Sequence, residues 1–199
     1  MNIYLIRHTS VYNPNKLCYG QSEMPLEENF TVDFDWIKDH LNFTTGKYYS
    51  SPLRRCTKLA AYLSDDAFDT DERLSELNFG DWEMKPWLNI NQKDIKAWED
   101  DFINYRVKKG ERFIDLYDRS IQFIEEMYLS KEENIVVVCH SAIIRSIISY
   151  ILDFPLEKVF NLKIDYSSIS KIAYDPNLEI NSIEFLNFSP DNFKITSKD

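Results

Sequence analysis

The sequence of 199 residues is poor in glycine and proline, with 4 of the first and 7 of the second. This scarcity argues against a linker, a low-complexity segment or an internal repeat, and it favours one folded domain over residues 1–199. No apolar run approaches the ~20 residues needed to span a bilayer, and no secretory signal follows Met1. We therefore expect neither a membrane protein nor a secreted one.

Basic charge and cysteine are also scarce. The chain has 23 Lys+Arg against 33 Asp+Glu, which gives a formal net charge of −10. Nucleic acids and anionic membranes bind positive faces, so neither is an expected partner. Cys18, Cys56 and Cys139 form no pair at metal-ligand spacing and no even-numbered framework. Such cysteines are typical of reduced thiols, and the sequence predicts a cytoplasmic protein without a bound metal.

What is present is an alternation of short apolar runs and helical patterns, in a chain that is 44% hydrophobic. Strands alternating with helices, followed by a β-rich tail, predict an α/β sandwich with a mixed sheet. The expected strands are 3–6, 47–50 and 135–139, with two or three more between 159 and 188 around a turn at 175–177. The expected helices are 52–64, 91–105, 111–129 and 142–152.

Two of the three histidines directly follow predicted strands. Arg7-His8 follows the run 3–6, and His140 follows the run 135–139. In open α/β sheets, ligands bind beyond the carboxyl ends of the strands. A hydrogen-bonded structural role explains either histidine taken alone. Their shared placement makes a functional role about as reasonable as a structural one.

A helix start and an acidic loop add candidate groups. Ser51 is predicted to cap the helix that begins at Pro52, and a helix N-terminus attracts anions. Arg55, in the first turn, offers a two-pronged donor suited to phosphate oxygens. The segment 73–83 has no clear periodicity and is predicted to be a loop. Its acidic residues Glu76, Asp81 and Glu83 are equal candidates for a catalytic acid at this point.

Four segments together resemble the histidine phosphatase (phosphoglycerate mutase-like) superfamily. They occur in the family's order and lie between residue 3 and about residue 152. The segments are Leu5-Ile6-Arg7-His8, Ser50-Ser51-Pro52-Leu53-Arg54-Arg55, the acidic loop 73–83, and Val138-Cys139-His140-Ser141-Ala142. The resemblance implies a three-layer α/β/α sandwich with a mostly parallel central sheet, and a helical insertion at about 83–110.

The resemblance also implies the roles of individual residues. His8 is the implied nucleophile and Glu76 the implied proton donor, while Arg7, Arg55 and His140 bind the phosphoryl group. A neutral imidazole is a competent nucleophile, and guanidinium groups suit the charge on the equatorial oxygens, so no metal or cofactor is expected. Implied substrate-binding residues are Thr9, Asn13, Gly20, Gln21 and Ser141.

The sequence departs from the family pattern at several of these positions. Thr9 stands where the family usually has glycine. Pro14 replaces a common asparagine, which makes Asn13 or Asn15 a candidate substitute. Ser141 and Ala142 replace a Gly-Gly pair. None of these changes removes a charged catalytic group, so activity is still expected.

Within the superfamily, the segment 7–26 looks most like the alpha-ribazole phosphatase branch. The expected activity is removal of the 5′-phosphate of alpha-ribazole phosphate, a small-molecule ester of cobalamin lower-loop assembly. A phosphoglycerate mutase-type phosphotransferase is disfavoured, because residues 83–105 are mainly acidic. A broad-specificity sugar phosphatase and a non-catalytic phosphoryl-binding protein are two further functions that the motifs allow.

Aromatic residues are concentrated in the expected insertion, and two interpretations of them are open. Trp98, Phe102 and Tyr105 share a helical face and are predicted to pack a small core of the insertion. Alternatively, Trp82 or Trp87 covers the site and stacks on a flat base of the substrate. The many carboxylates nearby are expected to repel a second anionic group on the substrate.

Overall fold

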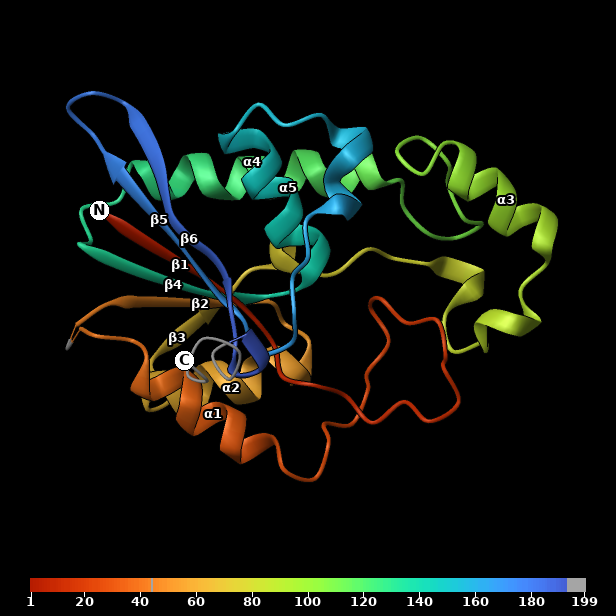
Figure 1. The fold of residues 1–199 in the computed structure, drawn as a ribbon, viewed down its shortest axis with the longest axis horizontal. Coiled ribbons are helices and arrows are strands. Elements are labelled where there is room, and N and C mark those ends of the chain that lie inside the picture. The colour runs from red at the N-terminus through yellow and green to blue at the C-terminus, as the bar shows by residue number, and fades with distance from the viewer. Residues whose placement is uncertain (44, 193–199) are drawn as a thin grey trace.

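In the computed structural model, which describes residues 1–43 and 45–192, one six-stranded sheet lies between two layers of helices (Figure 1). The strands are β1 (Asn2–Arg7), β2 (Lys47–Ser50), β3 (Phe68–Thr70), β4 (Asn134–Cys139), β5 (Ile169–Asp175) and β6 (Ile180–Phe188). Their order is β3-β2-β4-β1-β5-β6, and β1 to β4 are parallel to one another. Strand β5 is antiparallel to both of its neighbours. This arrangement confirms the predicted α/β fold with a mixed, mostly parallel sheet.

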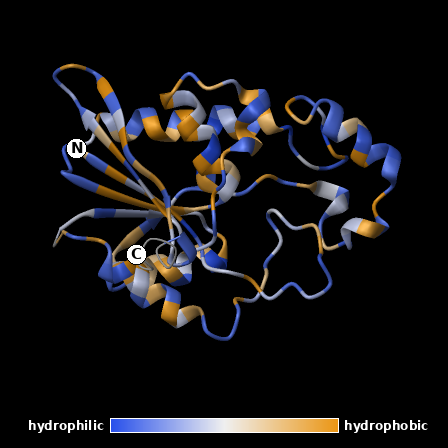
Figure 2. Ribbon diagram, in the orientation of Figure 1, coloured by the Kyte–Doolittle hydropathy of each residue, from blue (hydrophilic) through white to orange (hydrophobic). Residues whose placement is uncertain are grey.

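Helices α1 and α2 cover one face of the sheet, and α4 and α5 cover the other (Figure 1). The helices are α1 (Phe30–Asp39), α2 (Arg54–Ser64), α3 (Gln92–Asp100), α4 (Phe113–Tyr128) and α5 (Ser141–Ile151). Side chains of a strand alternate between faces, so Ile3 and Leu5 pack toward α4 and α5 while Tyr4 and Ile6 pack toward α1 and α2. In Figure 2 hydrophobic colouring is found both on the strands and on the helices that flank the sheet. Along the described ranges, no helix is both long and apolar enough to cross a membrane.

The segment between η2 (Gly80–Trp82) and α4 extends away from the sheet and contains η3 (Trp87–Asn89) and α3 (Figure 1). It has a small core of its own, in which Trp82, Ile90 and Val107 pack around Cys18. Trp87, Trp98 and Tyr105 are half-buried against this core. The interpretation that these aromatics pack the segment itself is therefore confirmed for most of them.

Several boundaries differ from the sequence-based expectations. Helix α1 and strand β3 lie outside the predicted elements, although Phe34 and Ile37 of α1 have helical spacing and are buried. The helix predicted over 91–105 ends at Asp100. The Asp101 carboxylate accepts hydrogen bonds from the backbone and side-chain nitrogens of Asn104, at 3.2 and 2.9 Å. This local turn competes with a further turn of helix.

The start of α2 also requires a correction. The helix begins at Arg54, and the N-cap residue is Leu53 rather than Ser51. The carboxylate of Glu23 accepts the Arg54 N–H at 3.0 Å and takes the place of a local side-chain cap. Among the backbone N–H groups of the described residues, the Ser51 hydroxyl accepts only that of Leu53, at 3.4 Å and before the first residue of the helix, and it lies 2.8 Å from Nε2 of His140.

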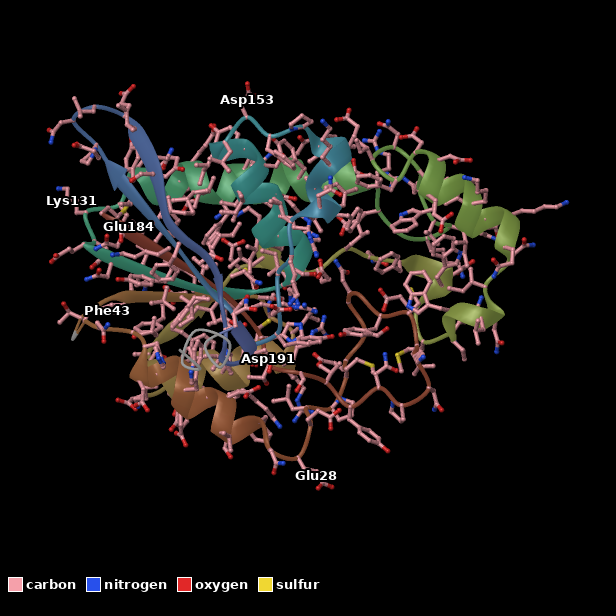
Figure 3. The ribbon with its side chains drawn as sticks, viewed as in Figure 1. Glu28, Phe43, Lys131, Asp153, Glu184 and Asp191 are labelled. Atoms are coloured by element: carbon pink, nitrogen blue, oxygen red, sulfur yellow. The ribbon has the colours of Figure 1, made fainter. Side chains whose placement is uncertain are left out.

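The parallel strands all end on the same side of the molecule. Lys131, labelled in Figure 3, precedes β4 at one end of the sheet, and Asp191 follows β6 near the other. The carboxyl ends of β1, β2 and β4 therefore lie together, on the side of the sheet that faces the segment carrying α3 (Figure 1).

Candidate active site

His8 and His140 lie side by side because their strands are parallel neighbours. Arg7 of β1 is in register with Cys139 of β4, and each histidine is the next residue along its strand. The His8 N–H donates to the Cys139 carbonyl at 3.1 Å, which extends the pairing by one residue. The ring centroids are 5.1 Å apart, and both side chains are buried. The structure thus brings together the two histidines that the sequence singled out.

The hydrogen bond of His8 fixes its tautomer. Nδ1 lies 2.7 Å from the carbonyl oxygen of Thr9, which can only accept, so Nδ1 carries the proton and Nε2 has a free lone pair. Burial, followed by the charges of Arg55 and Arg7, lowers the pKa of His8 well below its ordinary value. A neutral imidazole with an available Nε2 has the state required of a nucleophile.

His140 is held by the end of β2. Its Nε2 lies 2.8 Å from the hydroxyl of Ser51 and 3.5 Å from the Cys56 sulfur. Burial lowers the pKa of His140 as well, helped by the nearby His8 and by the charges of Arg55 and Arg7. Both imidazoles are therefore neutral at neutral pH, and the positive charge of the site comes from its arginines.

Arg7 is oriented by a loop and a tyrosine ring. Its Nη1 donates to the carbonyl of Ile164 at 2.7 Å, and its guanidinium carbon lies 3.6 Å from the centre of the Tyr166 ring. Such a cation–π contact holds the planar group in one orientation. The Nε atom of Arg7 is buried, and no hydrogen-bond partner for it exists in the described part of the chain.

Arg55 has the same arrangement on the opposite side. Its side chain is fully buried, its Nη1 donates to the Ser22 carbonyl at 2.9 Å, and its Nη2 donates to the Gly20 carbonyl. Its Nε also lacks a partner among the described residues, as does the buried hydroxyl of Thr9. Buried donors without partners are costly. Because Arg7 and Arg55 line the same cavity as His8, their two unpartnered Nε groups indicate a site that is completed by an anion.

Glu76 faces this cluster from the acidic loop. One carboxylate oxygen accepts the Leu77 N–H at 3.0 Å, and the other lies 3.4 Å from the Ser141 hydroxyl and from the Ala142 N–H at the start of α5. Asp81 instead forms an ion pair with Lys109 and does not line the cavity beside His8. Of the three acidic candidates, Glu76 is the one that lines the cavity together with His8.

Glu83 holds a loop rather than acting on a substrate. Its two oxygens accept backbone N–H groups from Gly20, Gln21 and Ser22 at 3.0 Å and from Phe79 at 3.1 Å. Burial opposes ionisation, but these hydrogen bonds outweigh it and hold the pKa of Glu83 below its usual range. Because Gly20 and Ser22 supply the carbonyls that bind Arg55, Glu83 indirectly positions that arginine.

Arg119 of α4 performs a similar task for Glu76. It donates to the carbonyls of Arg73 and Glu76 at 2.6 and 3.2 Å, and it is paired with Glu111 at 2.8 Å. Glu111 in turn accepts the Asn78 N–H at 2.9 Å. The sequence reasoning missed the positioning roles of Glu83, Glu111 and Arg119, because they depend on contacts between distant segments.

The site opens into a cavity of about 210 Å³. Arg145 on α5 is a lining residue that the sequence reasoning did not predict, although it lies one helical turn beyond Ser141 on the same face. Its Nε donates to the Leu162 carbonyl at 2.9 Å. The full lining consists of Arg7, His8, Leu17, Tyr19, Arg55, Glu76, Leu77, Phe79, Trp87, Phe113, Ser141, Ala142, Arg145 and Phe160.

Not all of the predicted substrate-binding residues reach this cavity. Ser141 and Trp87 line it, but Trp82 is buried in the core of the α3 segment, so the prediction that Trp82 covers the site is wrong. Asn13 turns back to the backbone of Leu17, with contacts of 3.0 and 2.8 Å, and does not replace the asparagine lost at Pro14.

Thr9, Gly20 and Gln21 lie around the cavity without lining it. Thr9 and Gly20 act through the carbonyls that bind His8 and Arg55. Gln21 bridges the Glu76 carbonyl and the Asn78 side chain. Among the residues placed in the structure, no group of three His, Cys, Asp or Glu side chains could hold a metal ion.

The fold and the cluster define an α/β protein with a cavity suited to an anion, beside a neutral histidine at the carboxyl ends of parallel strands. A family model confirms this class from the sequence. The chain belongs to the histidine phosphatase superfamily (branch 1), whose model matches residues 3–185, and it is a phosphatase of that superfamily.

Comparison with individual proteins gives relatives of several specificities. The chain is 27% identical over 178 residues to "Putative phosphoserine phosphatase 2" of Hydrogenobacter thermophilus, covering 85% of this chain and 88% of that one. It is 28% identical to the 6-phosphofructo-2-kinase/fructose-2,6-bisphosphatase 4 of Rattus norvegicus over 86% of this chain, but it spans only 37% of that longer protein. The alpha-ribazole phosphatase structure from Shigella flexneri has a TM-score of 0.86 at 24% identity and covers 94% of this chain and 96% of its own.

The lowered pKa values predict the titration of His8 and His140. Because the neutral form predominates above the pKa, both imidazoles should remain neutral at pH 6.5 in the folded protein and titrate only in more acidic solution. Histidine NMR spectra recorded against pH, with His8→Asn and His140→Asn to assign the signals, measure this directly. In the urea-unfolded chain the same residues should titrate near the ordinary value of about 6.5. A folded-state midpoint at or above that value for either histidine would contradict the assignment.

Proposed function

We propose that this protein is a metal-independent phosphomonoesterase that works through a phosphohistidine at His8. The observation that carries this proposal is the tautomer of His8, which leaves Nε2 free in a residue that lines one cavity together with Arg7 and Arg55. The buried Nε atoms of both arginines lack partners among the described residues. A phosphoryl group placed there meets a nucleophile and two guanidinium groups at once. Phosphoryl transfer depends mainly on such positioning and electrostatic stabilisation.

The reaction proceeds in two displacements. In the first, His8 Nε2 forms a bond to phosphorus, the bond from phosphorus to the ester oxygen breaks, and the Glu76 carboxyl group donates a proton to the departing alcohol. In the second, water attacks phosphorus, the phosphorus–nitrogen bond breaks, and the Glu76 carboxylate accepts the proton of the water. Inorganic phosphate leaves, and His8 and Glu76 return to their starting states.

The phosphohistidine can be trapped directly. Rapid quenching during turnover of a ³²P-labelled phosphate ester should leave base-stable, acid-labile label on the wild type and none on His8→Ala. Label and turnover should both survive exhaustive chelation, since guanidinium groups supply the positive charge. Equal labelling of His8→Ala, or a strict requirement for an added divalent cation, would refute the proposal.

The role of Glu76 predicts a dependence on the leaving group. Glu76→Gln should slow hydrolysis of alkyl phosphates by about 10²–10⁴-fold, because an alkoxide needs a proton to depart. Hydrolysis of p-nitrophenyl phosphate, whose leaving group departs without a proton, should be slowed much less. Steady-state kinetics on both esters gives the comparison, with Asp81→Asn as a matched carboxylate control outside the cavity. Equal loss on the two esters would contradict general-acid catalysis by Glu76.

The cavity supports two candidate substrate classes. The first, favoured by Arg145, is a phosphate ester with a second anionic group, as in phosphoserine or fructose 2,6-bisphosphate. Arg145 is half-buried, and its one hydrogen-bond partner within the described ranges is the Leu162 carbonyl, so the rest of its guanidinium can bind an anion. The acidic residues of 92–101 do not line the cavity, which removes the repulsion expected from the sequence. The phosphoserine and fructose-2,6-bisphosphate specificities in the names of the sequence relatives further support this class.

The second candidate is alpha-ribazole 5′-phosphate. It is supported by the aromatic lining of Phe79, Trp87, Phe113 and Phe160, on which a flat base could stack. We place it second because these aromatic side chains also pack against one another, which explains their presence without a ligand. The guanidinium of Arg145, in contrast, is partly withdrawn from water and needs an anionic partner.

The variant Arg145→Gln separates the two classes. On phosphoserine or fructose 2,6-bisphosphate, it should lower kcat/KM by about 10- to 100-fold, mainly through KM, as expected for loss of a charge-assisted hydrogen bond. On alpha-ribazole 5′-phosphate and p-nitrophenyl phosphate, it should change kcat/KM by less than about 3-fold, since neither has a second anion. The control is Arg54→Gln, an exposed arginine outside the cavity. A wild type that prefers alpha-ribazole 5′-phosphate and is insensitive to Arg145→Gln would establish the second candidate instead.

A further inference from the structure

Two tyrosines form a hydrogen-bonded bridge beside the proposed phosphoryl site. The hydroxyl oxygens of Tyr19 and Tyr166 are 2.5 Å apart, although the residues belong to loops 147 positions apart in the sequence. Tyr19 lines the cavity together with His8, Arg7 and Arg55. Tyr166 stacks on the guanidinium of Arg7, and its ring centroid lies 5.5 Å from that of His8. Neither tyrosine has a role in the chemistry described above.

The bridge connects the loops that orient the two arginines. Tyr19 precedes Gly20, whose carbonyl binds Arg55, and the Arg55 guanidinium carbon lies 5.4 Å from the Tyr19 ring centre. Tyr166 lies two residues after Ile164, whose carbonyl accepts a hydrogen bond from Arg7. A hydrogen bond between the tyrosines therefore fixes the distance between the two cationic sides of the site.

The hydroxyl pair leaves one proton unused. In a hydroxyl–hydroxyl pair one group donates and the other accepts, and the accepting group keeps a proton of its own. In the described ranges neither tyrosine hydroxyl has another hydrogen-bond partner. Tyr19 lines the cavity and Tyr166 does not. If Tyr166 donates to Tyr19, the Tyr19 hydroxyl keeps its own proton and can donate it to a ligand in the cavity.

We infer that Tyr19 is a further substrate-binding residue, whose O–H donates to an oxygen of the bound phosphoryl group while Tyr166 holds it in place. This inference rests on the proposed function, because the phosphoryl group is the ligand of that site. Burial, together with the neighbouring Tyr166, raises the pKa of Tyr19, so the hydroxyl keeps its proton at neutral pH. Tyr166 is a positioning residue for both Tyr19 and Arg7.

The test uses Tyr19→Phe, Tyr166→Phe and the double variant, each of which removes only hydroxyl oxygens from the bridge. Calorimetric titration with inorganic phosphate and with vanadate measures binding, and p-nitrophenyl phosphate turnover measures kcat and KM. Tyr19→Phe should weaken binding of both anions by about 10- to 100-fold, the scale of a hydrogen bond to a charged group. Tyr166→Phe should weaken it less, because Tyr19 keeps its own proton.

The double variant tests whether the Tyr166 hydroxyl acts only through Tyr19. If the Tyr166 hydroxyl acts only through Tyr19, the double variant should bind no more weakly than Tyr19→Phe alone. Tyr12→Phe, an exposed tyrosine outside the cavity, is the matched control and should bind like the wild type. Unfolding curves identify any variant whose loss comes from misfolding.

The outcomes also separate this inference from the proposed function. If the wild type turns over phosphate esters but Tyr19→Phe binds both anions as tightly as the wild type, the assignment of Tyr19 is wrong and the phosphatase proposal stands. Additive losses in the double variant would overturn the role of Tyr166. If the wild type forms no phosphohistidine yet binds phosphate in a Tyr19-dependent way, the proposed reaction fails and the binding residue stands.

Discussion

The parallel pairing of β1 with β4 is the constraint on which the site depends. One register places Arg7 opposite Cys139, and the next residue on each strand is a histidine. A slip by one residue would turn every side chain of a strand to the other face of the sheet. The apolar runs that bury Ile3, Leu5, Val136 and Val138 on their proper faces thus also bring the two imidazoles together. Core packing and chemistry are specified by the same alignment.

A second principle of the site is that backbone carbonyls orient its arginines. Carbonyls of Gly20, Ser22 and Ile164 accept hydrogen bonds from the terminal nitrogens of Arg55 and Arg7, while the Nε atoms of both arginines have no partner among the described residues. Loop conformation therefore determines where the positive charge lies. Gly20 is essential to this packing, because a Cβ at that position would lie 1.7 Å from the Leu77 carbonyl oxygen. Lysine, with one nitrogen, could not hold a carbonyl and a phosphoryl oxygen in this planar geometry.

The sequence predicted the parts of the fold and site that depend on local pattern. Apolar runs located β1 and β4, and motif order identified the residues that meet at the ends of the strands. The sequence did not predict the residues whose roles arise from contacts between distant segments. Arg119 reaches the Glu76 carbonyl across 43 positions, and Glu23 replaces Ser51 as the cap of α2 from 31 positions away. Trp82 was ambiguous because an aromatic residue suits a core and a binding site equally well.

The buried donors of Arg7, Arg55 and Thr9 have a thermodynamic consequence for the whole chain. Since they lack partners among the described residues, folding removes them from water without replacing those hydrogen bonds. Any tetrahedral oxyanion that binds the folded chain alone must then stabilise it in proportion to RT ln(1 + [L]/Kd). The reaction product is such an anion. Phosphate concentration therefore acts on this protein twice, since it raises the free energy of unfolding while it competes with substrate for the cavity that Arg7 and Arg55 line.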